Sequence, residues 1–210
     1  MNGQGIIIDL HGARLEGTLT VPAAAKGLVL FSHGSGSSRH SPRNRLVAAV
    51  LQREGFATFL FDLLTPQEDA DPDARFDIPL LTDRLIAVVR WTAGQAGLAE
   101  LPLGLFGAST GAASALGAAA ALPQTVKAVV SRGGRPDMAQ AVLSSVQAPT
   151  LLIVGGWDAP VISMNRFALD RLRCTKQLVI VQEATHLFEE PGKLDEVARL
   201  ATAWFARYLR

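Results

Sequence analysis

One short stretch, Gly107-Ala108-Ser109-Thr110-Gly111, constrains this chain more than any other part of its sequence. An apolar run, residues 103–106, precedes it, and a long run of alanine and glycine, residues 112–121, follows it. A strand, a sharp turn and a helix are therefore predicted, with the serine at the apex of the turn. The small neighbours permit so tight a turn, and the first unpaired N–H groups of the helix would face any negative charge that develops there. This geometry favours acyl transfer at Ser109.

A serine hydroxyl needs a general base to act as a nucleophile, and the base needs a carboxylate that orients it. Asp158 comes just after the apolar residues 150–154, and His186 lies in the loop after residues 176–181. The order serine, aspartate, histidine along the chain is that of α/β-hydrolases and differs from the orders in chymotrypsin and subtilisin. We therefore predict a catalytic triad of Ser109, His186 and Asp158.

Each partner of the serine has an alternative interpretation. Asp158 precedes Ala159-Pro160 and could cap a helix that begins there, a role that does not exclude catalysis. His186 could be an ordinary histidine of a surface loop. Asp137 follows the sixth predicted strand as Asp158 follows the seventh, which makes it a rival for the acid. We favour Asp158, because it lies closer to the end of a strongly apolar strand, whereas Pro136-Asp137 is typical of a helix start.

A second loop supplies candidate donors for the oxyanion of a tetrahedral intermediate. His33-Gly34-Ser35-Gly36 follows the apolar residues 28–31, and a glycine-rich loop after the third strand provides one such donor in this kind of fold. We predict that the backbone N–H groups of Ser35 and Thr110 bind the oxyanion. The alternatives are a plain glycine/serine loop and a phosphate-binding loop, but the Gly-Lys-Ser/Thr sequence of a P-loop is missing.

On the basis of these motifs, the chain resembles α/β-hydrolases of the dienelactone-hydrolase-like group. The resemblance extends from the His33-Gly34 loop to the His186 loop. The stretches SPRNR (41–45) and LFDLLT (60–65) also resemble small bacterial hydrolases of that group, some of which occur fused to or beside phosphoribosyltransferase domains. The resemblance implies a phosphoribosyltransferase-like protein as a partner. Dienelactone hydrolases proper carry a cysteine as the nucleophile, whereas here the single cysteine, Cys174, lies far along the chain from the motif. The serine therefore favours an esterase over the lactone hydrolysis of dienelactone hydrolases proper.

Eight strands are predicted, near residues 5–10, 15–21, 28–32, 57–61, 103–106, 126–131, 150–154 and 177–181. Six helices are predicted, near residues 42–54, 78–93, 110–122, 137–146, 161–172 and 194–209. The first two strands would form a hairpin around His11-Gly12, and the later alternation implies a mainly parallel sheet with helices on both faces. Residues 131–150 leave no room for an inserted lid domain, so we expect an open, shallow site. Residues 66–72 are expected to form an acidic surface loop.

Composition agrees with a globular protein and limits its partners. A chain of 210 residues with 49% hydrophobic and 19% charged residues suits one domain over 1–210. A net charge of +1 predicts no attraction to nucleic acid or to membranes. One cysteine, no basic leader and no long apolar span point to a cytoplasmic protein. We expect no metal or organic cofactor, and the sequence leaves a homodimer open.

Arginines near two of the predicted strand ends have two interpretations. Arg39, Arg43 and Arg45 would in most proteins solvate a helix start and pair with acids such as Asp62. In the alternative, Arg43 and Arg132, which lies at the end of the sixth strand, bind a carboxylate or phosphate of the substrate. We favour a serine hydrolase of small carboxylic esters, with thioesters and lactones as further candidates. The alternatives are a non-catalytic partner-binding protein and a hydrolase of an anionic substrate linked to a phosphoribosyltransferase pathway.

Overall fold

The computed structural model describes every residue of the chain except Met1, Asn2 and His11. Its strands are β1 (Gln4–Leu10), β2 (Ala13–Thr20), β3 (Leu28–Ser32), β4 (Ala57–Phe61), β5 (Leu103–Ala108), β6 (Val126–Arg132), β7 (Thr150–Gly155) and β8 (Lys176–Val181). Its α-helices are α1 (Pro42–Arg53), α2 (Pro66–Asp69), α3 (Ile78–Ala93), α4 (Thr110–Ala121), α5 (Ala159–Arg171) and α6 (Lys193–Tyr208). Two 3-10 helices, η1 (Ala74–Phe76) and η2 (Pro136–Ser145), complete the elements.

The strands form one eight-stranded sheet in the order β1-β2-β4-β3-β5-β6-β7-β8. The pairs β1/β2 and β2/β4 are antiparallel, and every other pair is parallel. The predicted N-terminal hairpin and mainly parallel sheet are thus confirmed, although His11 in the predicted turn lies outside the described residues. Because β3 and β5 to β8 run in the same direction, their carboxyl ends and the loops that follow them meet at one edge of the sheet.

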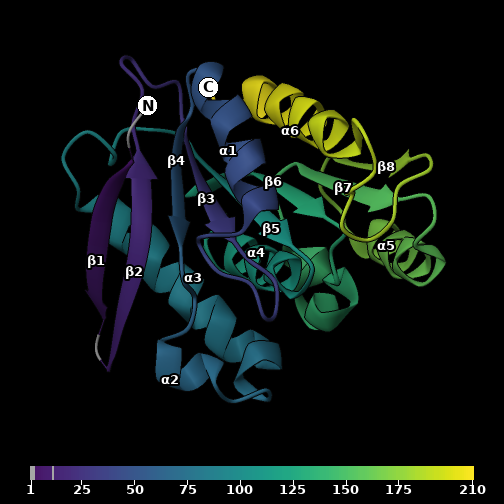
Figure 1. Cartoon of the computed structure of the whole chain (residues 1–210), viewed down its shortest axis with the longest axis horizontal. Helices are drawn as coiled ribbons and strands as arrows, with labels where there is room; N and C mark the ends of the chain where they lie inside the picture. Colours follow the sequence, from purple (N-terminus) through teal and green to yellow (C-terminus); the bar gives the residue numbers. More distant parts are fainter. Residues whose placement is uncertain (1–2, 11) are drawn as a thin grey trace.

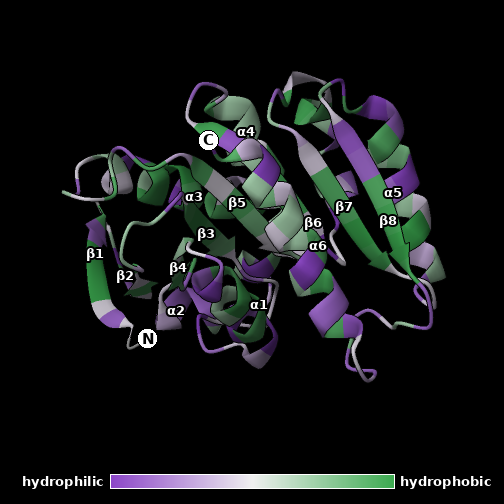
Figure 2. Cartoon of the chain, turned by 90° about the horizontal axis from the view of Figure 1, so that it is seen from above, coloured by the Kyte–Doolittle hydropathy of each residue, from purple (hydrophilic) through white to green (hydrophobic). Residues whose placement is uncertain are grey.

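Helices cover both faces of the sheet, as predicted (Figure 1). α1 and α6 pack against each other on one face, and α3, α4, η2 and α5 form a continuous layer on the other. The sheet therefore has a hydrophobic core on each side, one beneath α1 and α6 and one beneath the four-element layer. The central strands are hydrophobic along most of their length in Figure 2, because both of their faces are covered.

Two segments differ from the sequence prediction. The acidic stretch after β4 is not wholly a loop: Pro66–Asp69 forms one helical turn, in which Thr65 and Glu68 cap each other reciprocally. The sequence carries this signal for a helix start, since Thr65 and Glu68 have the spacing of a capping box and Pro66 occupies the first helical position. The predicted helix after β6 is a 3-10 helix with a kink at Ala139. This element is the only one between β6 and β7 in the described chain, so no lid domain lies there.

No helix in the described part of the chain has the length and apolar character needed to span a membrane.

Candidate active site

Ser109 lies at the apex of a strained turn between β5 and α4. Its backbone dihedrals, φ 52° and ψ −123°, are ones that a residue with a side chain rarely adopts. Both nearby glycines are needed for this turn. A Cβ atom at Gly107 would lie 2.5 Å from the Cα of Ala112, and one at Gly111 would overlap the carbonyl oxygen of Ser32. The two glycines therefore permit this turn, which places Ser109 directly after the end of β5.

The structure joins His186 to Asp158. Nδ1 of His186 lies 2.7 Å from Oδ2 of Asp158, a short hydrogen bond that directs Nδ1–H at the carboxylate and leaves Nε2 as the acceptor. Asp158 precedes α5, but its side chain makes no capping hydrogen bond, so its carboxylate serves the imidazole. The rival Asp137 forms an ion pair with Arg135 instead, at 2.8 Å. The acid nearest to His186 is thus the one that follows the seventh strand.

Ser109 and His186 each lie against residues at the end of β6. The N–H of Ser109 donates to the carbonyl oxygen of Arg132 at 3.2 Å, and Arg132 precedes Gly133. A Cβ atom added at Gly133 would lie 3.4 Å from Cε1 of His186. No hydrogen bond joins the Ser109 hydroxyl to the imidazole among the described contacts. Such catalytic hydrogen bonds are often long without substrate and tighten in its complex.

The glycine-rich loop packs directly against the nucleophile. A Cβ atom at Gly34 would lie 2.9 Å from Cβ of Ser109, so only glycine allows this approach. Of the two predicted oxyanion donors, the N–H of Ser35 donates to Oγ1 of Thr110 at 2.9 Å in the structure. The side chain of Thr110 reaches this amide because the loop and the first turn of α4 are so close. The N–H of Thr110 itself is in the first turn of α4, where no helical carbonyl can accept it.

His33 anchors this loop, a role that the sequence analysis missed. Its Nδ1 lies 3.0 Å from the carbonyl oxygen of Gly34, and its Nε2 accepts the N–H of Leu63 at 3.1 Å. Burial lowers the pKa of His33 below its usual 6.5, so the ring is neutral and Nδ1 carries the proton. The signal was a histidine placed directly between a buried strand and a glycine loop. His33 ties the loop after β3 to the end of β4.

Two exposed apolar side chains flank the acid and the base. Trp157 precedes Asp158 and is 64% exposed, and Leu187 follows His186 and is 37% exposed. The N–H of Trp157 donates to the carbonyl oxygen of Ala184 at 2.9 Å, which holds the two loops together. The sequence analysis did not anticipate these exposed apolar side chains next to Asp158 and His186.

The predicted basic residues have different environments. Arg39 pairs with Asp62, as its favoured interpretation requires, and with Glu16 at 2.6 Å. Arg43 pairs with Glu189 at 2.7 Å. Arg132 is only 6% exposed, and burial, together with the charge of Arg43, lowers its pKa to about 10. Arg132 is therefore the one of these three that lacks a carboxylate among the described residues.

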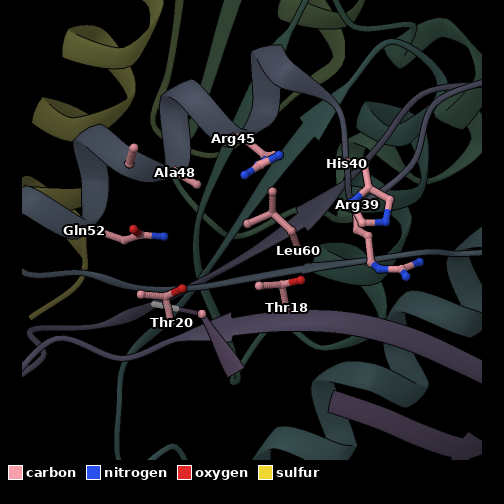
Figure 3. Close-up of a pocket in the computed structure, with 10 residues that line it drawn as sticks. Thr18, Thr20, Arg39, His40, Arg45, Ala48, Gln52 and Leu60 are labelled. Atoms are coloured by element: carbon pink, nitrogen blue, oxygen red, sulfur yellow. The ribbon is translucent and has the colours of Figure 1, made fainter. Parts of the chain in front are cut away.

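A separate hollow of about 400 Å³ lies between α1 and the end of the sheet formed by β2 and β4 (Figure 3). Thr18, Arg39, His40, Arg45 and Gln52 are among its lining residues, and none of the predicted triad is. Elsewhere in the described chain, no group of histidine, cysteine, aspartate and glutamate side chains is arranged to hold a metal ion.

A strained serine after the fifth strand, with an aspartate and a histidine after the seventh and eighth, defines the α/β-hydrolase class. The sequence model of the dienelactone hydrolase family matches residues 15–209, and the chain belongs to this family. The crystal structure of a dienelactone hydrolase from Anabaena variabilis is 53% identical, with a TM-score of 0.97, and the match covers 100% of this chain and 99% of that one. The predicted family is thus confirmed.

Other similar proteins extend the comparison. Two proteins from strains of Mycobacterium tuberculosis, each named "Putative phosphoribosyl transferase", are 58% identical over 195 residues. The match covers 93% of this chain and 44% of theirs, so the chain spans less than half the length of these relatives. Est1E from Butyrivibrio proteoclasticus shares the fold, with a TM-score of 0.84 at 16% identity over 97% of this chain and 98% of that one.

Proposed function

We propose that this α/β-fold hydrolase cleaves small carboxylic esters through an acyl-enzyme on Ser109, with thioesters and lactones as further candidate substrates. The observation that carries the proposal is the pair formed by His186 and Asp158, with 2.7 Å between Nδ1 and Oδ2, at the sheet edge where Ser109 projects. An imidazole held in this tautomer has a free Nε2 lone pair, which is the arrangement that a serine nucleophile requires.

In the proposed reaction, the Ser109 hydroxyl adds to the acyl carbon while its proton passes to Nε2 of His186. The resulting imidazolium is stabilised by the carboxylate of Asp158. Collapse of the tetrahedral intermediate breaks the bond to the leaving oxygen, which takes the proton from His186. Water then attacks the acyl group, again giving a proton to His186, and the return of that proton to Ser109 releases the acid and restores the enzyme.

The oxyanion of each tetrahedral intermediate would be bound by the backbone N–H groups of Thr110 and Ser35. The Thr110 N–H lies at the positive end of α4 and has no helical acceptor. To bind the oxyanion, the Ser35 N–H must give up its hydrogen bond to the Thr110 hydroxyl or donate to both acceptors at once. Since Thr110 is next to Ser109, to which the acyl carbon would be bonded, this exchange needs only a small movement.

The names of the Mycobacterium tuberculosis relatives favour a second candidate, a partner-binding unit that works with a phosphoribosyl transferase. The part of those proteins that this chain does not match makes up more than half of their length. That part is long enough to contain a phosphoribosyl transferase domain. A purely non-catalytic role would not require the strained turn at Ser109 or the His186–Asp158 hydrogen bond. We therefore rank the esterase first and treat a phosphoribosyl transferase as a candidate partner.

Steady-state kinetics on a panel of acetyl and butyryl esters, thioesters and lactones tests the esterase proposal. The wild-type protein should hydrolyse at least one class, and Ser109→Ala should lower kcat by about 10³-fold or more while the protein stays folded. Asp137→Asn is the matched control, because this acid pairs with Arg135 and not with His186. Near-wild-type turnover by Ser109→Ala would falsify the assignment of the nucleophile.

A further inference from the structure

A buried side chain of α5, Asn165, is bonded to the chain that leaves β6. Asn165 is fully buried, and its Nδ2 donates to the carbonyl oxygen of Gly134 at 3.0 Å and to that of Val161 at 2.8 Å. Val161 is one turn earlier in the same helix, whereas Gly134 lies just after β6. The bond to Gly134 therefore fixes α5 to the segment of residues 132–135.

The 132–135 segment is bonded to the backbone of Ser109 on both sides. The N–H of Ser109 donates to the carbonyl oxygen of Arg132 at 3.2 Å, and the N–H of Arg135 donates to the carbonyl oxygen of Ser109 at 3.0 Å. Ser109 has strained backbone dihedrals, which it keeps only because its surroundings hold it there. A displacement of the 132–135 segment would therefore change the position of Ser109.

The same segment lies against the proposed base. Gly133 has a φ of +52°, and its N–H donates to the carbonyl oxygen of Ile153 on β7 at 2.8 Å. A Cβ atom at Gly133 would lie 3.1 Å from the carbonyl oxygen of His186 and 3.5 Å from its Nδ1. The backbone of Gly133 thus limits where the imidazole can lie, and the next residue, Gly134, is the one that Asn165 binds.

The helix that carries Asn165 also presents the acid. Asp158 immediately precedes α5, and Asn165 follows it by seven positions, which is about two helical turns. Asn165 lies on the buried face of the helix, with Val161 one turn earlier. One rigid helix therefore places both the carboxylate that holds His186 and the amide that holds the 132–135 segment.

Stability alone does not favour an asparagine at this position. Asparagine is a weak helix former, because its side chain competes for backbone hydrogen bonds. Oδ1 of Asn165 is also buried and has no hydrogen-bond partner within the described chain, which costs stability. The residue is better explained by what its Nδ2 group holds in place.

We propose that Asn165 is a positioning residue for the triad, which acts on Ser109 and His186 through the 132–135 segment. This inference rests on the proposed esterase function. A misplacement of about 1 Å between reacting groups can cost about 10²-fold in rate. Loss of the bond to Gly134 should therefore lower kcat, whereas KM, which does not depend on the alignment of the triad, should change little.

Two substitutions of Asn165 test the proposal. Asn165→Leu keeps the size of the side chain but has no donor, so it loses both hydrogen bonds. Asn165→Ser is the milder change, because its hydroxyl can still donate to the carbonyl oxygen of Val161 but is too short to reach Gly134. Both variants should lower kcat on an acetyl ester by about tenfold or more and leave KM within about twofold of the wild type.

Thr150→Val is the matched control. Thr150 is also fully buried, and its hydroxyl donates to the carbonyl oxygen of Ala148 at 2.9 Å. It is the first residue of β7, at the end of the strand opposite to Asp158. Thr150→Val should lower the melting temperature, as the Asn165 variants should, and leave kcat unchanged. An equal loss of kcat in Thr150→Val would overturn the proposal, because the effect would then be one of stability.

NMR of protein labelled with 15N-histidine gives a readout that needs no hydrolysis. The bond to Asp158 holds His186 in the tautomer with the proton on Nδ1, whereas a freed imidazole divides between two tautomers. The 15N shifts of the two ring nitrogens distinguish these forms under alkaline conditions, and His186→Gln assigns the signals. Both Asn165 variants should move the shifts toward the tautomer mixture, and Thr150→Val should leave them unchanged.

The two readouts separate this proposal from that of the esterase. Unchanged His186 shifts in both Asn165 variants would overturn the positioning role, whatever their rates, and so would wild-type kcat in both variants of an active esterase. Shifts that move in a protein that hydrolyses no ester would support the positioning role and reject the esterase. Unchanged shifts, together with ester hydrolysis that Ser109→Ala abolishes, would reject the role of Asn165 and keep the esterase.

Discussion

The backbone N–H of Ser35 donates a hydrogen bond to the side-chain hydroxyl of Thr110, with 2.9 Å between nitrogen and oxygen. This contact joins the loop after β3 to the residue that follows the proposed nucleophile. It also occupies one of the two amides that we assign to the oxyanion. The Thr110 hydroxyl therefore holds the loop in place and must release or share the amide during the reaction.

Replacing this hydroxyl should change the rate more than the stability. Thr110→Val keeps the size of the side chain but removes the acceptor, so the loop loses its tie to α4 and kcat should fall by about tenfold. Thr110→Ser retains the acceptor and should stay within about threefold of the wild type. The measurement is kcat on one activated short ester, together with thermal melting. An unchanged kcat in Thr110→Val would mean that the hydroxyl does not position the Ser35 amide.

The assignment of the acid is tested by two asparagine substitutions. Asp158→Asn keeps the shape of the side chain but removes the charge that stabilises the imidazolium, so kcat should fall by about 10²–10⁴-fold. Asp137→Asn should cost less than about tenfold, because Asp137 pairs with Arg135. A larger effect at Asp137 than at Asp158 would move the acid to the segment after β6.

Substrate length should report that no lid domain lies between β6 and β7 in the described chain. Without a cover, added methylenes cannot be fully enclosed, and each is worth about 0.8 kcal/mol only when it is buried. Acetyl and butyryl esters should therefore be hydrolysed with a higher kcat/KM than dodecanoyl esters. Trp157→Ala should raise KM for the butyryl ester, since Trp157 is an exposed apolar residue next to Asp158. A kcat/KM that keeps rising beyond octanoyl esters would reveal an apolar channel and contradict this account.

Stability should fall in acid partly because of His33. Burial lowers the pKa of His33, so the folded protein keeps the ring neutral, whereas the unfolded chain takes up a proton near its usual pKa of 6.5. The unfolded state then binds more protons between these two pKa values, and the free energy of unfolding decreases as the pH falls through 6.5 toward the folded-state pKa. Melting temperatures of wild type and His33→Gln from about pH 8 to about pH 5 test this. The variant should lose less stability over that range; parallel curves would show that His33 does not contribute.

Much of the fold could be predicted because strand ends and loop residues carry strong local signals. The turn around Ser109 needs glycine on both sides, and the buried β3 and β5 leave continuous apolar runs in the sequence. The His186–Asp158 contact follows from topology, since consecutive parallel strands place their loops at the same edge. These features depend on short-range sequence and on chain order.

Other features depend on packing that no local pattern encodes. Whether the Ser35 amide is open or bound to Thr110 is decided by how closely a loop and a helix far apart in the sequence pack together. The burial of Arg132 depends on α1, which is nearly ninety positions earlier. The exposure of the Trp157 side chain likewise depends on how the rest of the chain packs around it.

Intact-mass spectrometry of the protein during turnover of a 4-nitrophenyl ester tests the central claim most directly. The account predicts a burst of about one 4-nitrophenolate per active site, and a mass increase equal to one acyl group that maps to Ser109. Asp158→Asn should slow the burst, and Ser109→Ala should show neither the burst nor the mass increase. An acyl group on another residue, or hydrolysis by the wild type that Ser109→Ala retains, would contradict the account.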